Sequence, residues 1–439
     1  MNHTDKKLHQ LFFPLFLEIL FTMLAGIVDT LMLSTVGDQA VGAVGTATTY
    51  INVFIIMFTI ISSGMMAVMT QYIGANRPGV AKITLKIGLI FNLILGLLFS
   101  LIMFFRGEWL LLTIGIAPNL LEPATTYLQV VGGFCFFSAL IPIFSSYLRS
   151  FGHPGPTMVG TIVGNAVNLL LNTLFLFVFH WGVFGVALAT SISRAVNLLW
   201  VFIASVRRIH VEADPNPPPT KALFSSIIRI GLPAALESAM YNLAMTLVIR
   251  YLNQMDADGT QATARSYAAQ ISHFSYSISF ALGQANAIMC GWRIGHGDLV
   301  TCNRETHRAT IYGIVSNFTV SVLLAVFSAP ILRLFTDDPM IIRLVQTLLI
   351  VDIVLEIGRA ASLVYGMALK TSGDAVYPMI IAVLFGFLFA AGGTWFFGLR
   401  LGWLAVGAYV GMTLDECTRA VLMFRRWCRG NWKKHMLVD

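Results

Sequence analysis

The sequence predicts an all-α polytopic membrane protein in which twelve transmembrane helices form two pseudo-symmetric six-helix bundles. Composition is the first observation: 57% of the 439 residues are hydrophobic and only 11% are charged, whereas soluble domains have about 25% charged residues. The second observation is that landmarks of the first half recur in the second half. Two homologous six-span bundles have the same orientation in the membrane, so the repeat is parallel about the membrane normal.

Twelve apolar segments are long enough to cross a bilayer as helices, at roughly 1.5 Å per residue. They fall at about 11–34, 43–73, 83–105, 123–148, 157–180, 183–206, 223–252, 264–291, 309–332, 341–369, 376–398 and 402–425. If the N-terminus is cytoplasmic, nineteen of the 28 Lys and Arg residues lie on the cytoplasmic side and six on the other. The positive-inside rule therefore predicts cytoplasmic termini, and it explains the net charge of +7 without nucleic acid.

A proline-rich segment at 210–221 divides the chain into lobes 1–209 and 222–439, because its prolines favour an extended, semi-rigid connector. Four landmarks recur at offsets near 220 residues: P-L-F-L-E (14–18) and P-A-A-L-E (233–237), Y-I-G (72–74) and R-I-G (293–295), L-R-S-F-G (148–152) and L-K-T-S-G (369–373), W-G-V-F-G (181–185) and W-L-A-V-G (403–407). Repeats of this kind place a substrate cavity near the membrane midplane and work by rocking one half against the other.

Carboxylates inside spans are the first candidates for function, because a charge at that depth costs about 2.5 to 3.5 kcal/mol. Asp29 in the first span is the leading candidate for proton or cation coupling, and Glu18 lies on nearly the same helix face. In the alternative interpretation, Asp29 pairs with a basic or amide group and Glu18 reaches the cytoplasmic headgroups. The acids within spans outnumber the arginines and favour a cationic guest: Glu18, Asp29, Glu237, Asp352, Glu356, Asp415 and Glu416 against Arg194, Arg359 and Arg419.

In the second lobe, Glu237 and Asp352 have no obvious local partner and are candidates for binding substrate or cation. Glu356 is a weaker candidate, because Arg359 follows it at i+3 and can pair with it. Asp415 and Glu416 precede Arg419 by four and three residues and are expected to pair with it.

Polar and aromatic residues complete the candidate set. Asn165, Asn168 and Asn172 recur at three- and four-residue steps in the fifth span, and amides can bond either protonation state of a carboxyl group. Helix-to-helix hydrogen bonding is their alternative role. His273 could relay protons or be a polar residue of the cavity wall, and Tyr241 could stack on a flat cation or pack in the core.

The sequence gives no support for an enzyme, because it has no H-E-x-x-H, G-x-S-x-G, P-loop or G-x-G-x-x-G motif. Five scattered cysteines without a C-x-x-C indicate neither zinc nor disulfides. We expect no cofactor, a monomer in the lipid bilayer, and small organic cations or amphipathic drugs as partners.

Several of these features together resemble the multidrug and toxic compound extrusion (MATE) transporters, in particular their proton-coupled bacterial branch. They are the two six-span lobes, V-D-T at 28–30 fifteen residues after a proline, I-G-A at 73–75 before a basic loop, and L-R-S-F-G at 148–152. The resemblance extends from about residue 8 to about residue 426. No single motif carries it, whereas their order and spacing do.

The resemblance implies an antiporter that exports cationic or amphipathic compounds in exchange for protons or sodium. Asp29 then matches the family's first-span aspartate, whose protonation is thought to bend that helix, and Asn168 matches the asparagine of the same site. Members of the proton-coupled branch often have an aspartate where this chain has Asn172. Tyr241 stands at about the depth of the sodium branch's seventh-span glutamate, which favours protons over sodium.

Two rival classes are a flippase of the same superfamily for lipid-linked precursors and a membrane enzyme or receptor. A flippase cavity should be basic to hold pyrophosphate, whereas this membrane interior is acidic. A receptor or enzyme should carry a soluble domain or a catalytic constellation, and the loops here are too short for one.

Overall fold

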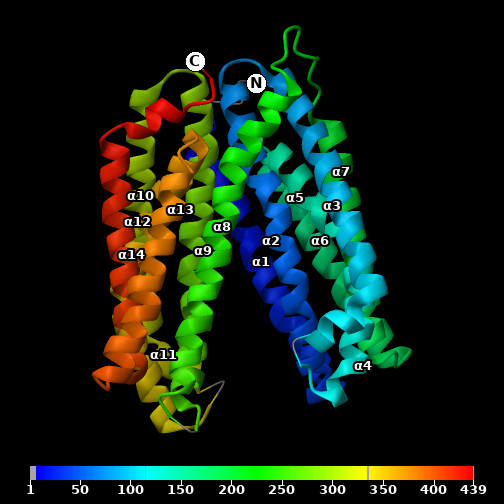
Figure 1. The fold of residues 1–439 in the computed structure, drawn as a ribbon, viewed down its shortest axis with the longest axis vertical. Helices are drawn as coiled ribbons and strands as arrows, with labels where there is room; N and C mark the ends of the chain where they lie inside the picture. The colour runs from blue at the N-terminus through cyan, green and yellow to red at the C-terminus, as the bar shows by residue number, and fades with distance from the viewer. Residues whose placement is uncertain (1–5, 114, 257, 334–335, 439) are drawn as a thin grey trace. The chain divides into compact units, whose positions relative to one another are not determined.

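The computed structural model describes residues 6–113, 115–256, 258–333 and 336–438, and the regular elements within these ranges are all helical (Figure 1). The first half of the chain forms α1 (Leu8–Ser34), α2 (Asp38–Gly74), α3 (Pro78–Thr113), α4 (Pro118–Tyr127), α5 (Cys135–Ser150), α6 (Pro154–Thr173) and α7 (Gly182–Arg208). The second half forms α8 (Thr220–Asn253), α9 (Thr260–Gly295), α10 (Leu299–Val326), α11 (Ser328–Leu332), α12 (Pro339–Ser372), α13 (Val376–Phe385) and α14 (Leu404–Cys428).

The predicted twelve-span, all-α fold is confirmed, although three spans are not continuous α-helices. The fourth span consists of α4, a π-helical turn (Leu128–Gly132) and α5, with a bend of 43°. The fifth span continues from α6 through a π-helical turn (Leu174–Val178). The eleventh span continues from α13 through two π-helical stretches (Gly386–Ala391 and Thr394–Arg400).

Hydropathy alone underestimates the number of spans. In the described part of the chain, eight helices are long and apolar enough to cross a membrane, or nine with the bent α4–α5 pair. The helices that fall short are α9, α12 and α14, which contain polar or charged residues such as His273, Asp352 and Arg419. These helices hold most of the second half's candidate site.

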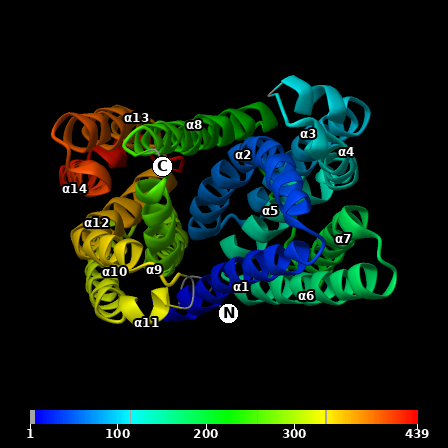
Figure 2. The ribbon, with the colours of Figure 1, turned by 90° about the horizontal axis from the view of Figure 1, so that it is seen from below.

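The chain folds as two compact units, one mainly of residues 13–231 and the other mainly of residues 232–438. The division falls inside α8, after Gly231. Within the first unit α2, α3 and α5 pack side by side, and within the second α9, α10 and α12 do so (Figure 2). We still predict that the lobes 1–209 and 222–439 are the parts that move against each other during transport.

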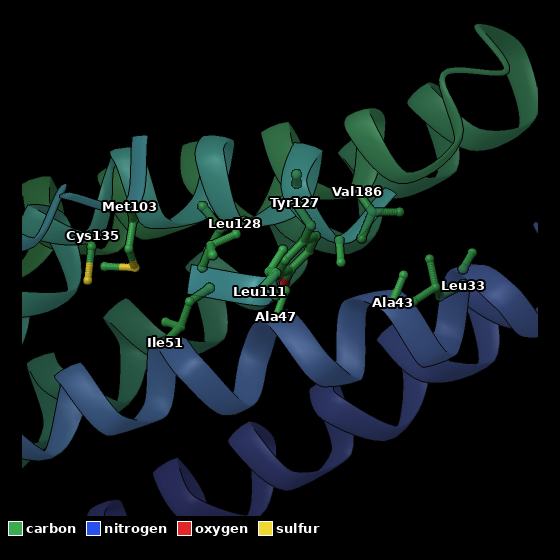
Figure 3. Packing of buried hydrophobic residues seen from close by; sticks show 14 of the residues in the cluster. Leu33, Ala43, Ala47, Ile51, Met103, Leu111, Tyr127, Leu128, Cys135 and Val186 are labelled. Atoms are coloured by element: carbon green, nitrogen blue, oxygen red, sulfur yellow. The ribbon is translucent and has the colours of Figure 1, made fainter. Parts of the chain in front are cut away.

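The core of the first unit is built where α2, α3, α4 and α5 converge. Figure 3 shows Ile51, Met103, Tyr127 and Leu128 there, and their side chains are almost fully buried. Close backbone approach adds to this packing in lipid, where small residues allow helices to meet. A Cβ atom on Gly64 would overlap the Ile227 carbonyl oxygen, and one on Gly231 would overlap that of Ile60.

The sequence repeat has a structural counterpart in two equivalent ion pairs. In the first unit Arg149 Nη2 lies 2.7 Å from Glu18 Oε1, and in the second Lys370 Nζ lies 3.1 Å from Glu237 Oε2. Each pair joins the acid after a repeat's opening proline to the base of its L-R-S-F-G or L-K-T-S-G motif. The landmarks therefore recur because they bind one another.

A similar contact joins the third and fourth spans of each unit. Asn92 Nδ2 on α3 donates to the Ala139 carbonyl at 2.8 Å, and Asn317 Nδ2 on α10 donates to the Glu356 carbonyl at 3.3 Å. Both asparagines are fully buried. The two hydrogen bonds join corresponding spans, although not at equivalent positions of the repeat.

The proline-rich connector between α7 and α8 is tied to the loop that joins α2 and α3. Arg77 donates from Nε to Asp214 Oδ2 at 3.0 Å and from Nη2 to Asp214 Oδ1 at 3.1 Å. This guanidinium holds the pKa of the Asp214 carboxyl below its usual range. A depressed carboxyl pKa means that the contact contributes stability at neutral pH and loses it as the pH falls through the folded-state pKa, below about 4.

We expect Arg77→Ala to release the connector, because Asp214 then has no bidentate partner. Cleavage after Glu212 by a glutamyl endopeptidase at neutral pH should become at least several-fold faster. Arg304→Ala, a matched removal of an exposed arginine on α10, should leave the rate unchanged. Equal cleavage rates in wild type and Arg77→Ala would show that this pair does not hold the connector.

Candidate functional site

Asp29 lies near the C-terminal end of α1 and is held by an amide of α6. Asn172 Nδ2 donates to Asp29 Oδ1 at 2.9 Å and also to Asn168 Oδ1 at 3.1 Å. Asn168 and Asn172 are buried. Asn172 Oδ1 is also buried and has no hydrogen-bond partner among the described residues. The amide thus offers a donor to an ionised carboxyl group and a spare acceptor to a protonated one.

The third asparagine of the predicted stripe also contacts α1. Asn165 Nδ2 donates to the Phe21 carbonyl at 3.1 Å, a hydrogen bond to backbone that serves packing. Asn165 therefore matches the structural alternative, whereas Asn168 and Asn172 match the site interpretation.

Asp29 also borders an open space within the first unit. A cavity of about 330 Å³ lies between α1 and α6, and its polar wall consists of Asp29, Asn165 and Asn168. The remainder is apolar, including Phe21, Leu24, Val28 and Leu169. Volumes of about 300 to 1,000 Å³ with a few polar groups are typical of small-molecule sites.

Among the described residues, no arginine or lysine nitrogen lies within 4.0 Å of the Asp29 carboxyl oxygens. Asp29 therefore forms no salt bridge in that part of the chain. Arg194 on α7 is the nearby cationic residue whose charge acts on Asp29. Its Nη1 is buried without a hydrogen-bond partner among the described residues. Asp29 is therefore bonded to a neutral amide and not to a permanent cation.

Three second-half candidates meet at one cavity of about 290 Å³ in the second unit. Tyr241 of α8, His273 of α9 and Asp352 of α12 all line it. Ser272 Oγ donates to Asp352 Oδ2 at 2.5 Å. Asp352 is thus a largely buried acid with a hydroxyl partner that can bond either of its protonation states.

Glu356 lies outside the wall of that cavity, in a charge network of α12 and α14. It bonds Arg359 and accepts from Asn317 Nδ2 at 2.9 Å. Arg359 also approaches Glu416 at 3.5 Å, and Glu416 pairs with Arg419 at 2.5 Å. Because its oxygens are occupied by permanent cations and an amide, this network best explains how α12 and α14 are held together.

Glu237 has a partner that its sequence neighbourhood did not reveal. Glu237 has no local partner, as the sequence indicated, but Lys370 lies 133 positions further along the chain and both Glu237 oxygens accept from its Nζ. Glu237 is not part of the cavity wall. The equivalent Glu18 is likewise bound, to Arg149 and to Thr157 Oγ1 at 2.8 Å. Headgroup contact is therefore not needed to explain Glu18.

Sequence reasoning missed Arg265, which lies at the start of the predicted span 264–291. It lines the same cavity as His273 and Asp352. Helical spacing could have found it, because Arg265, Ala269 and His273 recur every four residues on one face of α9.

We expect Glu237→Ala to reduce stability and to leave transport intact, because it removes one partner of a largely covered ion pair away from the cavity. Hydrogen bonds to charged groups contribute about 1.5 to 3 kcal/mol, so the melting temperature of the purified protein should fall by several degrees. Glu108→Ala, which removes an exposed glutamate of α3, is the matched control. Loss of efflux with an unchanged melting temperature would instead place Glu237 in the transport site.

Comparison with known proteins gives consistent matches over nearly the whole chain. The MatE family model matches residues 14–174 and 233–395, which begin at the prolines that open the two repeats. The chain is 31% identical to the "Uncharacterized transporter YisQ" of Bacillus subtilis, over 97% of this chain and 94% of that protein. It is 24% identical to the "Probable multidrug resistance protein NorM" of Thermotoga maritima, over 99% and 94%.

A solved structure has the same fold. The chain is similar to one described as "Crystal structure of MATE in the straight conformation", with a TM-score of 0.89 at 19% identity, covering 97% of this chain and 96% of that one.

Proposed function

This chain belongs to the MatE family of membrane transporters, and we propose that it exports cationic or amphipathic organic compounds across the bacterial cytoplasmic membrane in exchange for protons. The name of the Thermotoga relative, a probable multidrug resistance protein, supports drugs as the substrate class. The name of a Staphylococcus saprophyticus relative, "Multidrug export protein MepA", supports export as the direction. The observation that supports protons as the coupling ion is the hydrogen bond from Asn172 to Asp29 at the edge of a cavity.

Asp29 is proposed as the residue at which proton and drug compete. A lipid interior penalises an ionised carboxylate, so Asp29 is favoured in the protonated form unless a cation is near. Asn172 accepts from that protonated form, and it donates to the ionised form when a cation arrives. Binding of a drug cation thus expels the proton, and proton uptake from outside expels the drug, which is reciprocal coupling between two ligands.

The proton gradient supplies enough free energy for export. One inward proton is worth about 2.3 kcal/mol per 100 mV of membrane potential and about 1.36 kcal/mol per pH unit. Each 1.4 kcal/mol corresponds to a tenfold concentration ratio. When one proton is exchanged for one monovalent cation, the membrane potential acts equally on both and cancels. A single titrating carboxyl group can therefore sustain about a tenfold gradient of a drug cation per pH unit.

The fold supports alternating access as the transport mode. A parallel repeat of two bundles in one chain needs no partner subunit to form a central pathway, so the proposed unit is a monomer that rocks one bundle against the other. Asp352 and His273 are the second-half residues proposed to contact substrate or cation.

Replacing Asp29 by asparagine should abolish proton-driven efflux, because an amide cannot take up or release the proton. The assay is efflux of a fluorescent cation from proteoliposomes under an imposed pH gradient and, separately, under an imposed sodium gradient. Asp38→Asn is the matched control, because Asp38 is an exposed aspartate at the first position of α2. Full activity of Asp29→Asn, or efflux driven by sodium alone, would remove the proposal.

Replacing Asn172 by alanine should lower proton-driven efflux by more than tenfold, because Asp29 loses its described hydrogen-bond partner. A buried polar group left unsatisfied costs about 1 to 3 kcal/mol. Asn119→Ala, at an exposed asparagine of α4, serves as the control and should keep wild-type efflux. Efflux by Asn172→Ala at the wild-type rate would show that coupling does not need this hydrogen bond.

A further inference from the structure

The second unit's cavity contains an arginine without a carboxylate. Arg265 lines it, and no acid lies within 4.0 Å of its guanidinium among the described residues. Its Nη2 lies 3.8 Å from Met245 Sδ, and its Nε is buried with no hydrogen-bond partner in that part of the chain. A guanidinium has five N–H donors, and a buried donor without a partner is costly. Arg265 therefore has hydrogen-bonding capacity that the described residues do not use.

The other arginine of the same wall shows the contrast. Arg359 is bonded to Glu356 and approaches Glu416, so its charge is already balanced. Asp352, the acid of the wall, has a serine hydroxyl as its hydrogen-bond partner. The cavity thus presents one unbalanced cation and one acid that no arginine or lysine contacts directly, both within the described residues.

The space between these charges is aromatic. Tyr241, Tyr276 and Tyr409 line the same cavity. Tyr409 is influenced by the charges of both Asp352 and Arg265, which places it near each of them. Aromatic walls favour flat ligands, and Tyr faces also attract cations.

We propose that Arg265 binds the carboxylate of aromatic zwitterionic substrates, whose cationic end faces Asp352. The inference rests on the proposed export function and narrows its substrate class. A guanidinium matches a carboxylate bidentately, which gives both attraction and orientation. A simple organic anion would be repelled by Asp352, and a simple cation by Arg265, so the pair of charges selects a ligand with both.

Two fluorescent dyes test this proposal directly. Rhodamine 110 is a zwitterion with a free carboxylate, and rhodamine 123 is its methyl ester and a plain cation. Binding of each dye to the purified full-length protein in lipid nanodiscs is followed by fluorescence polarisation at fixed chloride. We expect wild type to bind the acid about tenfold more tightly than the ester. Equal affinities, or tighter binding of the ester, would overturn the proposal.

Variants assign the preference to Arg265. Arg265→Gln should weaken binding of the acid about tenfold and leave binding of the ester unchanged or tighter, because the repelling charge is gone, whereas Arg265→Lys should keep part of the preference. Arg343→Gln removes an exposed arginine of α12 and should leave both affinities unchanged. Unaltered acid preference in Arg265→Gln would overturn the assignment. Loss of ester binding in Arg265→Gln would indicate that this variant does not fold. In that case the acid-over-ester preference of the wild type, and its reduction in Arg265→Lys, test the proposal.

Efflux separates this inference from the function on which it rests. Proton-driven efflux of the ester dye with no preference for the acid would overturn the role of Arg265 and leave drug export standing. Failure of proteoliposomes to export either dye under a pH gradient would instead count against the proposed function itself.

Discussion

The hydrogen bond between the Asn172 amide and the Asp29 carboxyl group is the interaction on which the proposed transport cycle depends. It allows an acid to stay within an apolar helix bundle without a permanent counter-ion. An arginine in salt-bridge contact would keep Asp29 ionised and unable to exchange protons. A purely apolar neighbour would leave the carboxyl group without any partner. A neutral amide, which can donate or accept, is compatible with both protonation states.

The two bundles treat their buried charges in two ways. Some acids are bonded to permanent cations and hold helices together, as Glu18 is by Arg149, Glu237 by Lys370 and Glu416 by Arg419. Others, Asp29 and Asp352, bond only neutral groups in the described structure and border cavities. We infer that the first set provides stability and that the second set is available for ligands and protons, because only the second can change charge without losing an ion pair.

Much of the fold could be predicted from the sequence, because span length, hydropathy and the repeat are properties of short segments and of their order. The π-helical turns inside the fourth, fifth and eleventh spans could not, since one additional residue in a helical turn leaves no trace in hydropathy.

The candidate site could be predicted only in part. Asp29 was singled out because a charge in lipid is costly. The partner of Glu237 was not found, because helical spacing finds only neighbours at three or four positions and Lys370 is 133 positions away. Comparing the motifs of the two repeats would have paired them. Arg265 was not among the predicted site residues, because charges near the end of a span can face either water or a cavity and hydropathy does not distinguish the two.

The central claim is that a drug cation and a proton compete for Asp29. The most direct test adds a cationic dye to the purified protein in weakly buffered nanodiscs and measures the pH of the medium. The account predicts release of about one proton for each cation bound by the wild type, and no release when Asp29 is asparagine and the dye still binds. Binding of the cation to the wild type without proton release would contradict it.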